Sequence, residues 1–243
     1  MATARAADQF KGQARLPKFA VPRRYDLKLV PDLDACKFTG AVVVYVDVIE
    51  ETKFLVLNAA DLVVAEGSVS FRSQDSSQEL RPTEVINVVE DEVLVLAFKK
   101  ALPFGEGVLR IGFSGTLNDQ MKGFYRSEYV HNGEKKNMAV TQFEPADARR
   151  CFPCWDEPAF KVILFISPLV VSSLFCALRR RLPSYGDGHS SRDMISNLLI
   201  CAPMKGVTEL SKSSALEMLC CKNCDAMSTL ILGIASHDLL LRF

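Results

Sequence analysis

Gly123-Phe-Tyr-Arg-Ser-Glu-Tyr-Val-His-Asn-Gly-Glu-Lys-Lys-Asn-Met-Ala-Val-Thr-Gln-Phe143 gives the clearest indication of fold in this 243-residue chain. Two β-forming runs, residues 123–130 and 135–143, flank the four residues His-Asn-Gly-Glu. An Asn-Gly pair readily adopts the positive φ angles of a tight, primed turn. We therefore expect a β-hairpin with its turn at Asn132-Gly133.

Similar β-forming segments precede the hairpin. Residues 25–30 and 107–113 alternate between apolar and polar side chains, and residues 41–49 are rich in valine. Further strands are predicted at residues 53–57, 62–71, 85–89 and 93–98. Because these segments follow one another without helical periodicity, they predict an all-β fold, an antiparallel β-sandwich or saddle.

The hairpin's second strand is followed by a turn. Glu144-Pro145 end the strand, and Asp147 is in position to cap a short helical turn through residues 148–150. Pro153 and Pro158 prevent this turn from continuing as a helix.

Charge divides the chain into two regions. Residues 1–161 hold 21 basic and 23 acidic side chains, whereas residues 162–243 hold 8 and 6. We therefore predict a β domain at 1–161 and an irregular, poorly defined tail at 162–243. The formal net charge is zero, so no nucleic-acid partner is expected.

The first twenty residues contain no apolar run of signal-peptide length. The expected location is cytoplasmic, and the eight cysteines are then expected to be mostly reduced thiols.

The tail begins with an uncharged run, residues 162–178, followed by Arg179-Arg180-Arg181. One hypothesis is a membrane anchor, which would make the protein membrane-associated. Pro168 and the shortness of the run argue against it, and a buried strand at residues 162–166 explains the same residues. A third interpretation, which we prefer, is that the tail is a splice or gene-model product.

Three motifs, in order along the chain, resemble a known family. They are Gly123-Phe-Tyr-Arg-Ser127, Thr141-Gln-Phe-Glu-Pro145 and Ala148-Arg-Arg-Cys-Phe-Pro-Cys-Trp-Asp-Glu-Pro158. Together with the opening strand they resemble the N-terminal domain of zinc aminopeptidases related to aminopeptidase N and puromycin-sensitive aminopeptidase, in a plant-like form. The resemblance covers residues 10–161 and implies a chain truncated before the zinc domain.

The resemblance implies two substrate-binding residues. Glu144 would receive the α-ammonium group of a peptide with a free N-terminus, and Gln142 would line the pocket for the first side chain. A carboxylate shielded from water attracts an ammonium group more strongly than one in bulk solvent. The alternative is structural: Glu144 pairs with Arg149 or Arg150, and Gln142 bonds to backbone groups.

Catalytic residues of the family are not found in this sequence. The full-length family uses zinc, held by a His-Glu-x-x-His helix. The three histidines here, His131, His189 and His237, are far apart, and that motif does not occur. We therefore expect no metal ligand, no cofactor and no catalytic residue in this chain.

Two Cys-x-x-Cys pairs suggest another metal site. Cys151/Cys154 and Cys221/Cys224 have the spacing of zinc ligands, but 66 residues separate them. We expect the first pair to be structural, with Phe152 and Trp155 packing beside it.

Two functions remain open. The first is the substrate-anchoring N-terminal domain of a zinc metalloaminopeptidase, catalytically inactive by itself. The alternative is a non-enzymatic module that binds a peptide or pairs with a full-length paralogue, membrane-associated through residues 162–178 in one version.

Overall fold

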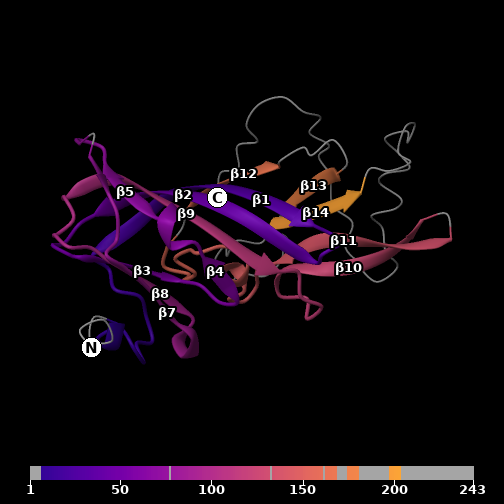
Figure 1. Ribbon diagram of the computed structural model, residues 1–243, viewed down its shortest axis with the longest axis horizontal. Helices are drawn as coiled ribbons and strands as arrows, with labels where there is room; N and C mark the ends of the chain where they lie inside the picture. Colours follow the sequence, from indigo (N-terminus) through magenta and orange to yellow (C-terminus); the bar gives the residue numbers. More distant parts are fainter. Residues whose placement is uncertain are drawn as a thin grey trace, which may run out of the picture.

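The computed structural model describes residues 7–76, 78–131, 133–160, 162–168, 174–180 and 197–203. They form three β-sheets with short 3₁₀ turns, so the predicted all-β class is confirmed (Figure 1). All strand pairs but one are antiparallel within the described residues.

The largest sheet has seven strands. Its order is β12 (Ile163–Pro168), β1 (Ala20–Asp32), β2 (Lys37–Val48), β9 (Gly105–Thr116), β5 (Ser70–Ser73) and β6 (Glu79–Leu80), with β4 (Leu62–Val64) also on β9. Alternate residues of β2 point into the core, which is why the valine-rich run forms a strand. Gly40 occupies one inward position opposite Phe113, whose ring fills the space of the missing side chain.

A second sheet contains β3 (Phe54–Asn58), β8 (Val93–Ala97) and β7 (Glu84–Val88), with β8 in the middle. Every residue of β8 is buried, as its unbroken apolar sequence predicts. Buried side chains of both sheets belong to one hydrophobic core, for example Val44 with Leu109 and Leu55 with Val95. The two sheets thus share a core, as in the predicted sandwich.

The predicted hairpin is confirmed as β10 (Gly123–His131) and β11 (Glu134–Gln142). Gly133 has a φ of +80°, as the turn requires, and Asn132 lies outside the described residues. Figure 1 shows the hairpin reaching beyond the main sheet. Gln142 pairs with Gly123 at the end of the hairpin opposite its turn.

Strands also form after residue 161. β12 pairs with β1 in parallel and buries Leu164 in the core, so the strand predicted at residues 162–166 is confirmed. β13 (Leu174–Arg180) pairs with β14 (Asn197–Pro203), which also contacts β11. The hypothesised anchor, residues 162–178, therefore forms parts of two strands, and residues 169–173 lie outside the described set. No helix in the described part of the chain has the length and apolarity needed to cross a bilayer.

One predicted strand is wrong. Residues 62–71 divide into β4, a 3₁₀ turn (Glu66–Ser68) and β5. Ser68 explains the break, because its hydroxyl donates to the Ala65 carbonyl (2.6 Å) and accepts the Gly112 N–H (2.8 Å). Such side-chain bonds to the backbone compete with the ladder.

Candidate functional site

Gln142 and Glu144 lie where β11 leaves its sheet. Gln142 is exposed and pairs with Gly123 across the hairpin, whereas Phe143 is buried and Glu144 is half-buried. Thr141, within β11, and Phe143, directly after it, are both buried, and the exposed Gln142 lies between them. The structure brings the two predicted binding residues together on one short segment.

Buried aromatic residues fix this segment. The Asp147 N–H donates to the Phe143 carbonyl at 2.9 Å, which closes a turn around Glu144. The Phe143 ring packs edge-on against Phe152, with ring centres 6.1 Å apart, and Phe152 packs in the same way against Tyr25 at 5.8 Å. The predicted packing role of Phe152 and Trp155 is confirmed, because both are buried.

Gly123 lets the turn lie directly on the hairpin. A Cβ added there would lie 2.5 Å from the Arg150 Cβ and 3.1 Å from the Asp147 carbonyl oxygen. Its φ of +66° is also the left-handed value that favours glycine. Arg150 therefore lies beside the strand end that carries Gln142.

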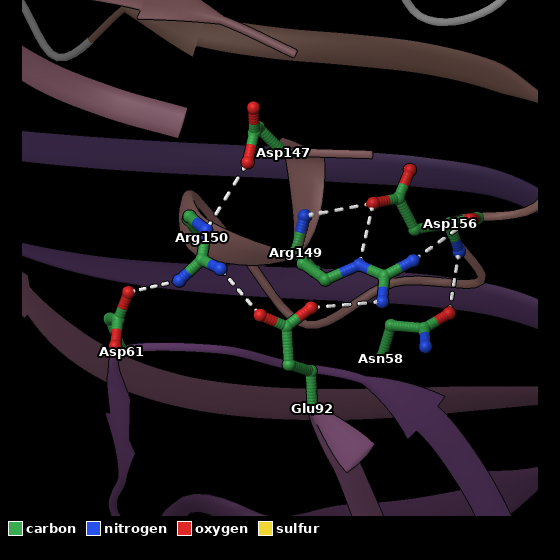
Figure 2. Close-up of polar contacts among 7 residues, drawn as sticks. All are labelled: Asn58, Asp61, Glu92, Asp147, Arg149, Arg150 and Asp156. Carbon is green, nitrogen blue, oxygen red and sulfur yellow. Dashed lines mark hydrogen bonds and ion pairs between the residues drawn. The ribbon is translucent and has the colours of Figure 1, made fainter. Parts of the chain in front are cut away.

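A network of charged side chains surrounds the turn (Figure 2). The Arg150 guanidinium donates to Asp61 and Glu92, and its Nε donates to Asp147 at 3.2 Å. Partial burial by itself lowers the pKa of Arg150, but the carboxylates around it, chiefly Glu92, raise the pKa above its usual value. Arg150 is thus a fully charged, fully paired cation.

Arg149 completes the network. Its Nη1 donates to Glu92 at 3.1 Å and its Nε donates to Asp156 at 3.0 Å. Burial raises the pKa of Asp156, and the Arg149 guanidinium opposes that shift without cancelling it. Figure 2 shows the Glu92 carboxylate between the two guanidinium groups.

The structural alternative, an ion pair of Glu144 with Arg149 or Arg150, is not seen among the described residues. Both arginines pair with other carboxylates, and among the described residues neither Gln142 nor Glu144 has a side-chain hydrogen bond or ion pair. The prediction that Asp147 caps the turn at η3 (Ala148–Arg150) is wrong. It makes no side-chain cap bond, and its carboxylate binds Arg150 instead.

Glu92 and Asp61 were not anticipated from the sequence. They lie more than 50 residues before the arginines they bind, so no local spacing indicates the contact. Both have positive φ angles, +54° and +56°, which sequence patterns do not predict for such residues.

The cysteines near the site have a structural role. Cys151 and Cys154 are free and buried, and burial raises the pKa of both thiols well above its usual value. Cys154 forms a two-way backbone bridge with Asn58, at 2.8 and 3.1 Å. The described residues include no group of three side chains able to ligate a metal, so they do not fit a zinc site. Cys221 and Cys224 lie outside the described residues.

A surface depression of about 610 Å³ lies elsewhere, lined by parts of β1, β2, β5 and β9. Two basic residues, Arg23 and Arg72, and three acidic residues, Asp47, Asp75 and Glu106, line it, and no residue of the segment 141–156 does. It is therefore separate from Gln142 and Glu144.

The sequence of this chain is similar to those of known proteins. Residues 21–169 match the model of the Peptidase M1 N-terminal domain. The chain is 66% identical over 166 residues to Aminopeptidase M1-A of Oryza sativa subsp. japonica and 64% identical over 167 residues to Aminopeptidase M1 of Arabidopsis thaliana. It is 32% identical over 154 residues to Endoplasmic reticulum aminopeptidase 2 of Homo sapiens.

Each alignment covers most of this chain but only a small part of the relative. The aligned residues are 68%, 69% and 61% of this chain but only 19%, 19% and 16% of those three relatives. The chain thus spans about a fifth of the length of the plant aminopeptidases it matches. Since the family model covers more than half of the chain, the chain belongs to the peptidase M1 family, whose N-terminal domain it contains.

Proposed function

We propose that this chain is the substrate-anchoring domain of a metalloaminopeptidase, in which Glu144 receives the free amino terminus of a peptide. One observation carries the proposal: Glu144 is a half-buried residue whose carboxylate is unpaired among the described residues, although two arginines follow it closely. A carboxylate left unpaired at a partly desolvated position favours a cationic ligand.

The charge around Glu144 favours the same ligand. The network contains two cations, Arg149 and Arg150, and four carboxylates, Glu92, Asp61, Asp147 and Asp156. Its formal charge is therefore −2, and Glu144 makes it −3. Such a field attracts an ammonium group and disfavours an anion.

Gln142 supplies the second part of the site. Gln142 is exposed two residues before Glu144, and its amide can donate to or accept from a peptide. Because Phe143 anchors the backbone between Gln142 and Glu144, the spacing of the two side chains is fixed.

Hydrolysis is not part of the proposal for this chain alone. Its sequence has no His-Glu-x-x-His motif, and the described residues do not fit a zinc site. We propose that these residues bind substrate and that the 243-residue chain does not cleave it unaided. We also propose a cytoplasmic location, which free thiols at Cys36, Cys151 and Cys154 support.

The test is a titration of the 243-residue chain, followed by NMR chemical shifts, with the peptide Leu-Gly-Gly amide. A single partly exposed ion pair contributes about 1 kcal/mol, so the free-amine peptide should bind about fivefold more tightly than its N-acetylated form. Glu144→Ala should abolish this difference. Equal binding of both peptides to the unaltered chain would overturn the proposed function.

A matched control separates the ion pair from general damage. Glu128→Ala removes a carboxylate from an exposed position of β10. This variant should keep the preference for the free amine.

A further inference from the structure

The Glu92 carboxylate is shared between consecutive arginines. One oxygen accepts from Arg150 and the other accepts from Arg149 at 3.1 Å (Figure 2). Glu92 itself lies far from the turn in sequence, directly after the 3₁₀ turn η2 (Val89–Asp91) that precedes β8. It makes no recorded contact with Glu144 among the described residues.

Backbone contacts hold the arginine segment independently of these side chains. The Ala60 N–H donates to the Arg149 carbonyl at 3.0 Å, and the Arg150 N–H donates to the Asp147 carbonyl at 3.1 Å. The bridge between Asn58 and Cys154 adds two more bonds. Main-chain bonds and buried rings thus hold the segment in place in addition to the ion pairs of its guanidinium groups.

Arg150 is a potential competitor for Glu144. Its Cβ lies against Gly123, the residue paired with Gln142, and an arginine side chain is long and flexible. If it were free, its guanidinium group would be attracted to the unpaired Glu144 carboxylate. A peptide's ammonium group would then have to displace an intramolecular partner.

We propose that Glu92 is a positioning residue that keeps the Arg150 guanidinium away from Glu144, so that Glu144 remains available to a ligand's ammonium group. This inference rests on the proposed function and names the residue on which its site depends. Neither other partner of Arg150 replaces Glu92: the side chain of Asp61 is 77% exposed, against 32% for Glu92, and Asp147 accepts only from Nε, whereas Glu92 accepts from Nη2 at the end of the side chain. Exposed pairs contribute little.

The backbone of Glu92 supports this role. Its φ of +54° is rare for a residue other than glycine and asparagine, and Asp61 has a φ of +56°. Such conformations persist where surrounding contacts stabilise them, and they are common at functional sites. Four described residues other than glycine have a positive φ, and two of them, Asp61 and Glu92, present their carboxylates to the same arginine.

The test is the same peptide titration on four variants of the 243-residue chain. Glu92→Gln keeps the shape and removes the charge, and it should weaken binding of Leu-Gly-Gly amide about fivefold, to the level of the acetylated peptide. Glu90→Gln is the matched control, since Glu90 is exposed in the same turn. It should bind like the unaltered chain.

Recovery of peptide binding in a double variant distinguishes a positioning role of Glu92 from a purely structural one. Arg150→Gln removes the competitor, so the double variant Glu92→Gln/Arg150→Gln should recover binding to within about twofold. Arg150→Gln alone should bind at least as tightly as the unaltered chain. A loss of binding in Arg150→Gln would overturn the inference, and this single variant decides the matter if Glu92→Gln does not fold.

The outcomes separate the two proposals. If the unaltered chain shows no preference for a free amine, the proposed function fails. If it does show the preference and Glu144→Ala loses it, but Glu92→Gln keeps it, only the role of Glu92 is overturned.

Discussion

Tyr25 shows how a single buried hydroxyl connects the first strand to the motif that follows the binding segment. Its side chain is fully buried, and its hydroxyl oxygen accepts a hydrogen bond from the backbone N–H of Trp155 at 2.9 Å. The residues are 130 positions apart, so this bond closes a long-range contact across the core. The Tyr25 ring also packs on Phe152, which in turn supports Phe143.

We predict that Tyr25→Phe lowers the free energy of unfolding by about 1–3 kcal/mol, because the buried backbone N–H of Trp155 loses its acceptor. Urea unfolding measures the change. Tyr129→Phe, at a half-buried position on β10, is the control and should change it by less than about 0.5 kcal/mol. Equal effects of the two substitutions would contradict this account of Tyr25.

Alkaline pH should destabilise the chain through its buried acids. Burial raises the pKa of Tyr25, Cys151 and Cys154 well above the usual values. In the unfolded chain thiols ionise near pH 8.5. The folded state then binds more protons than the unfolded state, so the free energy of unfolding falls as the pH rises above about 8.5.

We therefore predict that Cys151→Ala reduces the loss of stability between about pH 8 and about pH 10. Urea unfolding at the two pH values measures it. Cys36→Ala is the control and should leave the loss of stability nearly unchanged, since the Cys36 thiol is only half-buried. An unchanged slope in Cys151→Ala would show that this thiol does not contribute.

At the scale of elements, the junction between the β10–β11 hairpin and the η3 turn depends on Gly123. The glycine combines a left-handed φ with contact to Arg150 and Asp147, so two separate costs oppose a side chain there. Gly12 has the same φ of +66°, but no atom lies within 4 Å of an added Cβ. Comparing substitutions at Gly12 and Gly123 therefore separates the cost of backbone strain from the cost of steric overlap.

Gly12→Ala should cost about 1–2 kcal/mol of stability from the left-handed backbone alone. Gly123→Ala should cost about 1–3 kcal/mol more, because the hairpin and the turn must move apart. It should also remove the preference for a free-amine peptide. Thermal or urea unfolding of both variants provides the comparison, and equal costs would contradict the close contact at Gly123.

Element positions could be predicted where the sequence pattern is local. The Asn-Gly pair predicts a hairpin, and alternation along residues 107–113 predicts a strand; the structure contains both the β10–β11 hairpin, with a positive φ at Gly133, and β9. The break within residues 62–71 was missed because it depends on Ser68 bonding to Gly112, which is 44 residues away. Long-range bonds of this kind leave no periodic signal in the sequence.

The same distinction holds for the candidate site. Gln142 and Glu144 follow from a contiguous motif, and the structure places them together at a strand end. The partners of Arg149 and Arg150 do not follow, because a sequence shows which side chains can pair but not which carboxylate is near. The sequence offered Glu144 as a partner for these arginines, whereas in the structure they share Glu92 and also pair with Asp61, Asp147 and Asp156.

At the scale of the whole molecule, β12 extends the main sheet beyond the predicted boundary at residue 161. It pairs with β1 over six residues, and Leu164 is fully buried against the core. The family match likewise continues to residue 169. The division into residues 1–161 and 162–243 remains a prediction, and the contribution of β12 to stability tests it.

Leu164→Ala should lower the free energy of unfolding by about 2–5 kcal/mol if β12 is part of the domain core. Val63→Ala is the control, because Val63 is 70% exposed, and it should change stability by less than about 0.5 kcal/mol. A negligible effect of Leu164→Ala would place the boundary at residue 161, as the composition suggests.

The most direct measurement of the central claim is a crystal structure of this chain with Leu-Gly-Gly amide bound. The account predicts the peptide's ammonium nitrogen within about 2.7–3.2 Å of the Glu144 carboxylate. It also predicts Gln142 beside the first side chain and Arg150 still paired with Glu92. A peptide bound in the depression beside Asp47 and Arg72, or Glu144 paired with Arg150, would contradict it.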